Sequence, residues 1–516
     1  MKKFTLLVLF LGLCASVFAQ KTLISENTYQ KVAISFHSDS LTVEEVSANG
    51  SLFSRISMPD YDVSYNSGAP QLPLFSKLLQ IPVCDSVFVT ILDAEYTEYA
   101  AADLGITHPL YPAQPSFSKS ATNPPFYYDQ TVYTTDTFYA LPLVSAEKAG
   151  IRRDIALANV YFSPVQYNPV THRVRIYTRV DVEFTFANTD MAMTNSLKKY
   201  SSPMFTMDST MVINKMKNTA KNEFQGVPIK YLIIAGSTFS SNANLTQFVE
   251  WKRRLGYLVE VAYTSDASVG TTTTSIKNFI QNKYNNATTS DPAPTFLLLI
   301  GDVAQIPAYA STVDPGGSET HYTDLYYSTL TGNDNIPDCY CGRLSATNAT
   351  QLNNQLAKIM MYEQYTMPDP SYLGNAVLIA GTDNTWSTTH ADGQINYAAR
   401  YVKTNSTTHN YTTVYKHNYN CSSQAATIRS EISAGVGFAN YTAHGNSSGW
   451  YEPAFNTSHI SSLSNTNKYG LLIGNCCLTG KFDESECFAE AIMRAQNKGA
   501  MGYIGASKET YWDQDV

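Results

Sequence analysis

A histidine and a cysteine near the end of the chain each follow a short apolar run, and together they could form an activated nucleophile. His444 follows residues 436–441, and Cys477 follows residues 471–473. A free thiol has a pKa of about 8.5, so it needs a neighbouring base to become the reactive thiolate at neutral pH. An imidazole supplies that base. The pair indicates acyl transfer through a cysteine, and the alternative is that both residues only pack in a core.

Two further positions could complete such a site. Gly445 has no Cβ, so a substrate carbonyl can approach its amide, and the Cys477 amide could be the second donor of an oxyanion hole. Asp383 follows another apolar run, residues 376–380, and could orient the imidazole through its second ring nitrogen.

The elements that must position these residues read as an α/β pattern. Buried strands are predicted at 231–235, 295–300, 376–380, 436–441, 471–473 and 501–504. Helical periodicity occurs at 245–255, 275–284, 351–362, 395–404, 424–433 and 487–496. This alternation predicts a mostly parallel sheet flanked by helices, with functional residues beyond the carboxyl ends of its strands. No run carries a glycine-rich phosphate fingerprint, which disfavours a nucleotide enzyme.

The chain before about residue 200 has a different pattern. Short alternating β-branched segments at 31–37, 86–92, 174–177 and 180–186 predict an antiparallel, sandwich-like domain. Residues 204–226 are polar and rich in lysine and asparagine, so we expect an exposed linker that is open to proteolysis. Lys215, Lys217 and Lys221 stand in it.

Composition limits the class of protein. With 516 residues and 44% hydrophobic side chains, the chain can build several cores, which excludes disorder as its main state. A net charge of −8 without a basic block argues against nucleic acid as a partner. Lys2, Lys3, the apolar run 4–13 and the small residues before Gln20 predict a cleaved signal peptide at 1–19, and no later stretch predicts a transmembrane segment.

Three longer motifs resemble the gingipain family of secreted bacterial cysteine peptidases. They are residues 441–445 (YTAHG), 474–477 (GNCC) and 487–495 (CFAEAIMRA). The similarity covers 231–516 and, more weakly, the family's pro-domain over 20–225. It implies a caspase-like α/β fold of two subdomains preceded by a β-rich pro-domain that inhibits the enzyme. The boundaries we expect are 1–19, 20–221, 222–370 and 371–516, with the last subdomain truncated at its end.

The resemblance also assigns roles to residues. It makes Cys477 the nucleophile, His444 the general acid and base, and Asp383 the third member, with the oxyanion held by the Gly445 and Cys477 amides. Cys476 is expected to be a small buried neighbour.

Substrate preference follows from the same resemblance. The lysine-specific members match residues 511–515, where Asp515 corresponds to their selecting acid and Trp512 would line the pocket against the methylene stem. The arginine-specific members place their acid in the region of Asp392. Each carboxylate could also be an ordinary surface acid. Lysine is favoured, and arginine is the second choice.

A structural calcium site is implied as well. The stretch 331–338, followed by Gly342-Arg343-Leu344-Ser345, resembles the family's calcium loop, and hard cations take carboxylate and carbonyl oxygens. The expected ligands are Asp302, Thr331, Asp334, Ile336 and Asp338. Without the resemblance, this composition reads as an Asn/Asp turn. No organic cofactor is expected.

The sequence therefore predicts a secreted or surface-attached bacterial cysteine endopeptidase, made as a precursor, that cleaves protein or peptide substrates after basic residues. Two alternatives stay open. One is a non-enzymatic adhesin or pseudo-peptidase that keeps the fold, and the other is a caspase- or legumain-like peptidase that prefers acidic residues or asparagine.

Overall fold

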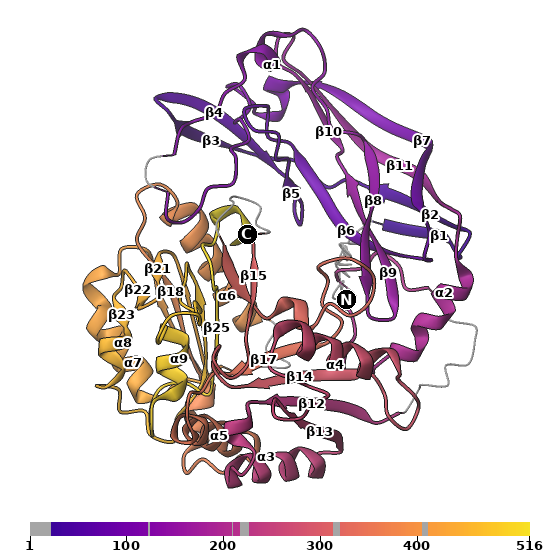
Figure 1. The fold of residues 1–516 in the computed structure, drawn as a ribbon. Helices are drawn as coiled ribbons and strands as arrows, with labels where there is room; N and C mark the ends of the chain where they lie inside the picture. The colour runs from indigo at the N-terminus through magenta and orange to yellow at the C-terminus, as the bar shows by residue number, and fades with distance from the viewer. Residues whose placement is uncertain are drawn as a thin grey trace, which may run out of the picture.

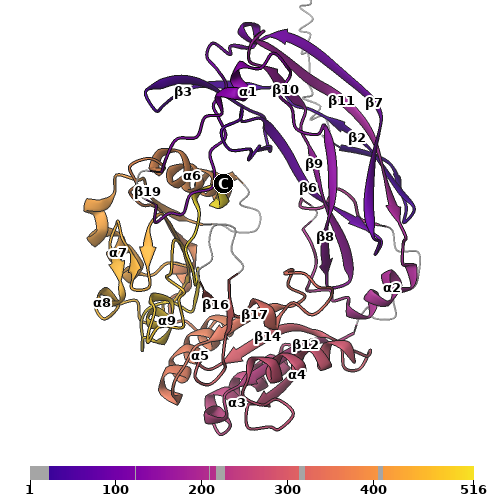
Figure 2. The same cartoon turned by 45° about the horizontal axis from the view of Figure 1, so that its top comes forward.

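The computed structural model describes residues 22–121, 124–208, 210–216, 227–312, 320–404 and 411–515, so the predicted signal peptide lies outside the described residues. A strand-rich N-terminal part arches over two α/β units, and it meets them at two separate places (Figures 1 and 2). We call these parts the β domain (β1–β11), the first unit (β12–β17) and the second unit (β18–β25).

The β domain is a sandwich of antiparallel sheets, as predicted. One sheet runs in the order β1 (Thr22–Asn27), β2 (Lys31–His37), β11 (Arg173–Ala187) and β10 (Val165–Asn168), with β7 (Ser86–Ala100) also paired to β11. A second sheet contains β5 (Asp62–Val63), β6 (Pro73–Ile81), β9 (Ile155–Phe162) and β8 (Val144–Arg152), and β3 (Thr42–Ala48) pairs with β4 (Ser51–Ser57). Alternating side chains of β2, β6, β9 and β11 form the core between the sheets.

The predicted strands 174–177 and 180–186 are one strand, β11. Its register against β7 shifts between Tyr177 and Arg179, so Thr178 forms a bulge. A bulge inserts one unpaired residue and breaks the alternation of apolar residues, which explains why the sequence suggested two strands.

The first unit is a four-stranded parallel sheet between helices. The strand order is β13 (Tyr257–Tyr263), β12 (Ile229–Ala235), β14 (Pro294–Ile300) and β17 (Tyr340–Leu344). Helix α4 (Thr273–Asn285) covers one face, while α3 (Ala243–Arg254) and α5 (Ala349–Glu363) cover the other. Successive residues of β12 enter opposite cores, as expected for a strand buried on both sides.

The second unit holds five parallel strands in the order β19 (Thr413–His417), β18 (Asn375–Ala380), β20 (Phe438–Thr442), β24 (Leu471–Asn475) and β25 (Gly502–Gly505). Its helices are α6 (Asp392–Thr404), α7 (Ala425–Ala434), α8 (Thr457–Ile460) and α9 (Phe488–Arg494). The predicted α/β class, with a β-rich domain in front, is confirmed.

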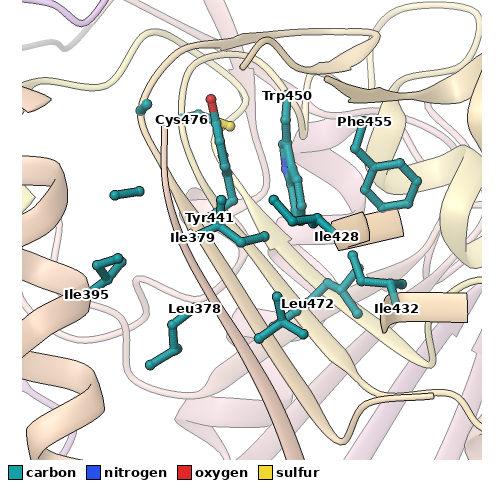
Figure 3. Close-up of a cluster of buried hydrophobic side chains, with 14 of the residues drawn as sticks. Leu378, Ile379, Ile395, Ile428, Ile432, Tyr441, Trp450, Phe455, Leu472 and Cys476 are labelled. Atoms are coloured by element: carbon teal, nitrogen blue, oxygen red, sulfur yellow. The ribbon is translucent and has the colours of Figure 1, made fainter. Parts of the chain in front are cut away.

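Aromatic rings fix the region next to the predicted nucleophile. Trp450 stacks on Tyr441 with ring centroids 4.8 Å apart, and Phe455 packs against Trp450 edge to face (Figure 3). A small antiparallel sheet continues this layer. Its middle strand is β22 (Gly449–Trp450), which pairs with β21 (Gly445–Asn446) and with β23 (Phe455–Asn456). Burial of one large apolar side chain contributes about 1.5–3 kcal/mol, so this cluster holds the end of β20 firmly.

The predicted exposed linker is partly wrong. Val212 bridges to Leu78 of β6, and Asn214 exchanges hydrogen bonds with Gln80, accepting at 2.7 Å and donating at 3.1 Å. Residues 210–216 therefore lie along the β domain because their apolar side chains find a partner strand there. Lys215 is exposed, whereas Lys217 and Lys221 lie outside the described residues.

Candidate active site

The pairing of β20 with β24 brings the predicted base and nucleophile to one edge of the sheet. The strands are parallel neighbours, and Thr442 pairs with Asn475. His444 and Cys477 each follow two residues beyond these paired positions. Both line one cavity of about 630 Å³, which Asp383 also lines. The three residues line the same cavity, and both the predicted contact of the sulfur with the imidazole and their catalytic roles remain predictions.

Asp383 holds the imidazole. Its Oδ2 lies 2.8 Å from Nε2 of His444, and its Oδ1 accepts hydrogen bonds from the amides of Thr385 (2.7 Å) and Trp386 (2.6 Å). Burial alone would raise the pKa of the Asp383 carboxyl, but His444 and these two amides together keep its pKa below the usual range. The carboxylate is therefore charged at neutral pH, and it fixes one imidazole nitrogen.

The thiol of Cys477 is 2% exposed, yet polar groups surround it. The Thr510 amide donates to its sulfur at 3.4 Å, and the Thr510 hydroxyl lies 3.7 Å away. Ser120 of the β domain places its hydroxyl at 3.7 Å from the same sulfur. One of the groups next to the thiol thus comes from the N-terminal part of the chain.

Gly445 and Cys476 explain how closely the two strand ends approach. A Cβ on Gly445 would lie 2.7 Å from the sulfur of Cys476 and 3.1 Å from the Cys477 carbonyl oxygen. Cys476 is fully buried in the core of the second unit, as predicted (Figure 3). Only glycine fits at position 445 without moving the cysteine segment.

A segment of the β domain lies across this site, with one bridge at Ser118 followed by a turn in which the Ala121 amide donates to the Ser118 carbonyl at 2.9 Å. Ser118 forms an antiparallel bridge with Tyr511, the Lys119 amide donates to the Thr510 carbonyl at 2.8 Å, and the Trp512 amide donates to the Phe117 carbonyl at 3.2 Å. Glu509 accepts hydrogen bonds from Ser118 and Ser120, both at 2.8 Å. Main-chain pairing of this kind is how many proteins bind extended peptides.

The side chain of Lys119 enters a pocket beside the cysteine and is fully buried. Its ammonium group donates to the Asn475 carbonyl at 2.8 Å and to the Asn475 Oδ1 at 3.1 Å. It also lies 5.2 Å from the ring centroid of Trp512, at cation–π distance. The sequence reasoning identified Trp512 but missed Lys119 and Asn475. Asn475 stands at the carboxyl end of β24, and that position was the available signal.

The two candidate selecting acids are Asp392 and Asp515. The Asp392 carboxylate accepts a hydrogen bond from the Tyr419 amide at 2.9 Å, and Asp392 does not line the cavity that holds Cys477 and His444. Its neighbour Gln394 lies nearer, with Oε1 3.3 Å from Nδ2 of Asn475. The side chain of Asp515 lies outside the described residues, so its role stays a prediction.

The predicted calcium ligands are engaged by protein groups. Asp334 accepts from the amides of Ile151 (2.8 Å) and Ile336 (2.9 Å), while Asp338 accepts from those of Thr331 (2.6 Å) and Arg153 (2.5 Å).

The remaining carboxylate, Asp302, pairs instead with Arg494 at 2.9 Å. Among the residues that the structure describes, no group of three or more His, Cys, Asp or Glu side chains has the arrangement of a metal site. In the described residues, Asp302 is thus ion-paired with Arg494, and backbone amides donate to Asp334 and Asp338. Calcium remains a prediction, and no chemical step depends on it.

Two further features concern cysteines and membranes. None of the seven cysteines that the structure describes is in a disulfide. Within the described ranges, no helix combines the length and the apolarity needed to cross a bilayer.

Two family models match the chain, one on each side of the linker. Residues 20–206 match the C25 propeptide, and residues 225–515 match peptidase family C25. The resemblance to the gingipains is thereby confirmed.

Individual relatives support the same family assignment. Lys-gingipain HG66 of Porphyromonas gingivalis is 34% identical over 499 residues, which are 96% of this chain and 28% of that protein. Gingipain R2 of the same organism is 28% identical over 443 residues, 84% of this chain and 56% of its own length. The chain thus spans little more than a quarter of the first of these relatives. A solved structure titled "Structure of Protease" is 40% identical, with a TM-score of 0.51 over 56% of this chain and 61% of that one. Together, the two model matches show that this chain belongs to peptidase family C25, with the family's propeptide region in front of its peptidase region.

Proposed function

We propose that the chain is the latent precursor of an exported cysteine endopeptidase that cleaves after lysine. The observation that carries the proposal is the placement of Lys119. A lysine side chain occupies the pocket beside Cys477, and the segment that bears it is hydrogen-bonded through its main chain to Thr510 and Trp512. The residue after Lys119 touches the sulfur, which is where the bond following a selected residue would be attacked.

The chemistry is acyl transfer. The Cys477 thiolate adds to the carbonyl carbon of the selected residue, and the amides of Gly445 and Cys477 donate to the oxygen that becomes negative. His444 protonates the departing amine as the carbon–nitrogen bond breaks. It then takes a proton from the water that attacks the thioester, and the thiolate leaves. Asp383 keeps the imidazole oriented and stabilises its charged form.

Preference for lysine is supported by the acceptors in the pocket. An ammonium group is a compact charge with three donors, and the two oxygens of Asn475 accept from it at one place. Asp515 would add the selecting charge at this pocket. Arginine is the weaker candidate because Asp392, the acid expected for it, is engaged by the Tyr419 amide.

Latency and export complete the proposal. The β domain covers the thiol, so it must be removed before substrates can bind, and the lysines at 215, 217 and 221 are the sites where the enzyme would cut its own precursor. The signal peptide predicted at 1–19 supports a secreted or surface location. Protein and peptide substrates and the chain's own pro-domain are the proposed partners.

A panel of chromogenic peptides ending in lysine, arginine, aspartate or asparagine tests the proposal after the β domain has been released. We expect the lysyl peptide to be cleaved fastest, and the Cys477→Ala protein to cleave none of them. Equal rates in the two proteins would show that there is no peptidase at this site. Cleavage after aspartate or asparagine would replace lysine with another preference.

A further inference from the structure

The β domain touches the peptidase region at a second place, remote from Cys477 in the fold. The tip of the β8–β9 hairpin reaches the first unit, at the end of the arch opposite to the second unit (Figures 1 and 2). We propose that this contact is a separate binding site on the first unit for the hairpin residue Arg153, and that it keeps the β domain attached after the linker has been cut.

The guanidinium group of Arg153 is the centre of the contact. Arg153 is 1% exposed. Its Nη1 donates to the carbonyls of Pro294 (2.8 Å) and Asp338 (2.7 Å), its Nη2 donates to the Ala293 carbonyl at 3.1 Å, and its Nε donates to Tyr200. Four donors of a rigid fork are thus matched by main-chain oxygens, three of which belong to the first unit.

The backbone of the hairpin is shaped for the same loop. Arg153 has a φ of +59°, a conformation that favours glycine or asparagine in a two-residue turn. In this conformation its amide donates to Asp338 at 2.5 Å, and the Ile151 amide donates to Asp334 at 2.8 Å. A Cβ on Gly150 would lie 2.5 Å from an oxygen of Asp334, so a glycine is needed for the approach.

Aromatic packing from the following segment adds to the site. Tyr200 stacks on Tyr284 of α4 with centroids 4.1 Å apart, and Leu197 is 1% exposed in the same core. Phe205 packs on Tyr340 at 4.7 Å and lies under the guanidinium of Arg152 at 4.0 Å. Residues 197–205 belong to the propeptide match, whereas Tyr284 and Tyr340 belong to the peptidase match. After the linker is cut, the two sides of this contact therefore belong to different polypeptides.

A substrate competes with the β domain at only one of the two contact sites. The pocket that holds Lys119 is the one that a substrate needs, and substrates compete for it. The Arg153 site is not used by a substrate, and removing the guanidinium leaves buried carbonyl groups without donors, which costs free energy. Because the Lys119 and Arg153 contacts are on the same domain, each contact keeps the other at a high effective concentration near its site. Loss of the Arg153 contact therefore weakens the hold on the active site without any change there.

The test uses the full chain with Cys477→Ala, so it needs no peptidase activity and is independent of the proposed function. A recognition sequence for a site-specific protease is inserted after residue 221, the linker is cut, and the dissociation rate of the two pieces is measured. We expect Arg153→Met to raise this rate at least tenfold, Arg153→Lys to raise it less, and Arg173→Ala, whose guanidinium pairs with Glu98 within the β domain, to leave it unchanged. An unchanged rate for Arg153→Met would overturn the proposal.

A second measurement covers the case in which Arg153→Met does not fold. Hydrogen exchange of the Ile151 and Arg153 amides is followed in the parent protein before and after the cut. We expect slow exchange in both states, because Asp334 and Asp338 still accept these hydrogen bonds. Exchange at the rate of open peptide after the cut, while the pieces are still associated, would contradict the proposal.

Discussion

Cys477 and His444 are neighbours because of strand register, and each could be identified from its position after an apolar run. The same reasoning found Asp383, whose carboxylate binds the imidazole. It did not find Asn475 as a binding residue, because an asparagine at a strand end has no distinctive chemistry until its partner is known. That partner, Lys119, comes from another domain, and no local pattern connects the two residues.

Asn475 provides a direct test at the residue scale. Asn475→Ala removes an oxygen that accepts from the lysine ammonium at 3.1 Å. A hydrogen bond to a charged group contributes about 1.5–3 kcal/mol, so kcat/KM for lysyl peptides should fall about 10- to 100-fold. Asn384→Ala, another asparagine that lines the cavity of Cys477 and His444, is the control. Equal effects of both variants on the lysyl peptide would contradict this role.

Gly445 is expected to be intolerant of even one methyl group. In Gly445→Ala the new Cβ would meet the Cys476 sulfur at 2.7 Å and push the cysteine segment away from His444. Displacement of a reacting atom by about 1 Å can cost 100-fold in rate, so we expect kcat to fall by about that factor while the protein stays folded. Gly393→Ala is a matched control because nothing lies within 4 Å of its Cβ. Normal kcat for Gly445→Ala would show that the approach is not needed.

At the scale of elements, the central strands of both α/β sheets were predicted, whereas only one of the four edge strands, β25, was predicted (at 501–504). The predicted segments 231–235, 295–300 and 376–380 became β12, β14 and β18, which are buried on both faces. The missed strands β13, β17 and β19 lie at the edges of the two sheets. These three strands carry charged residues such as Glu260, Arg343 and Lys416, so they lack the continuous apolar run that indicates a buried strand.

One edge strand carries a pH-dependent contact. His417 of β19 lies 2.7 Å from Glu431 of α7 and 2.8 Å from Gln424. Burial alone would lower the pKa of His417, but hydrogen bonds from its ring to Glu431 and Gln424 raise it above the usual value. A raised pKa means that this stabilisation is fully present below the unfolded pKa of about 6.5, and that it is lost as pH rises through the folded value.

Glu431→Gln should therefore destabilise the fold in a pH-dependent way. We expect a loss of about 1–2 kcal/mol in the free energy of unfolding at pH 5.5, and a smaller loss at pH 9, measured by denaturant unfolding. Glu250→Gln, in an exposed pair with Arg253, should change stability little at either pH. The same loss at both pH values would show that His417 is not charged in the folded protein.

At the scale of the whole molecule, the two α/β units are joined by buried polar contacts. Arg494 of α9 binds Asp302 of the first unit at 2.9 Å, and Lys358 of α5 donates to the carbonyls of Ala495 and Lys498 at 3.1 Å. Burial lowers the pKa of Lys358 to about 7. Such contacts between distant segments depend on the assembled fold, and for that reason sequence patterns did not predict them.

The β domain also acts at this scale, because it covers the thiol. Lys119→Ala should weaken its hold on the second unit, and we expect alkylation of Cys477 by iodoacetamide in the uncut chain to become at least tenfold faster. The rate is read by mass spectrometry of the Cys477 peptide. Lys31→Ala, whose ammonium pairs with Glu26 and Glu183 within the β domain, is the control. No change for Lys119→Ala would mean that other contacts alone protect the thiol.

Labelling with a lysyl chloromethyl ketone tests the nucleophile, the pocket and latency together. After release of the β domain, we predict one label per molecule, on the sulfur of Cys477, formed faster than with the arginyl reagent and absent from the uncut precursor. Labelling of another cysteine, or faster labelling by the arginyl reagent, would contradict the account.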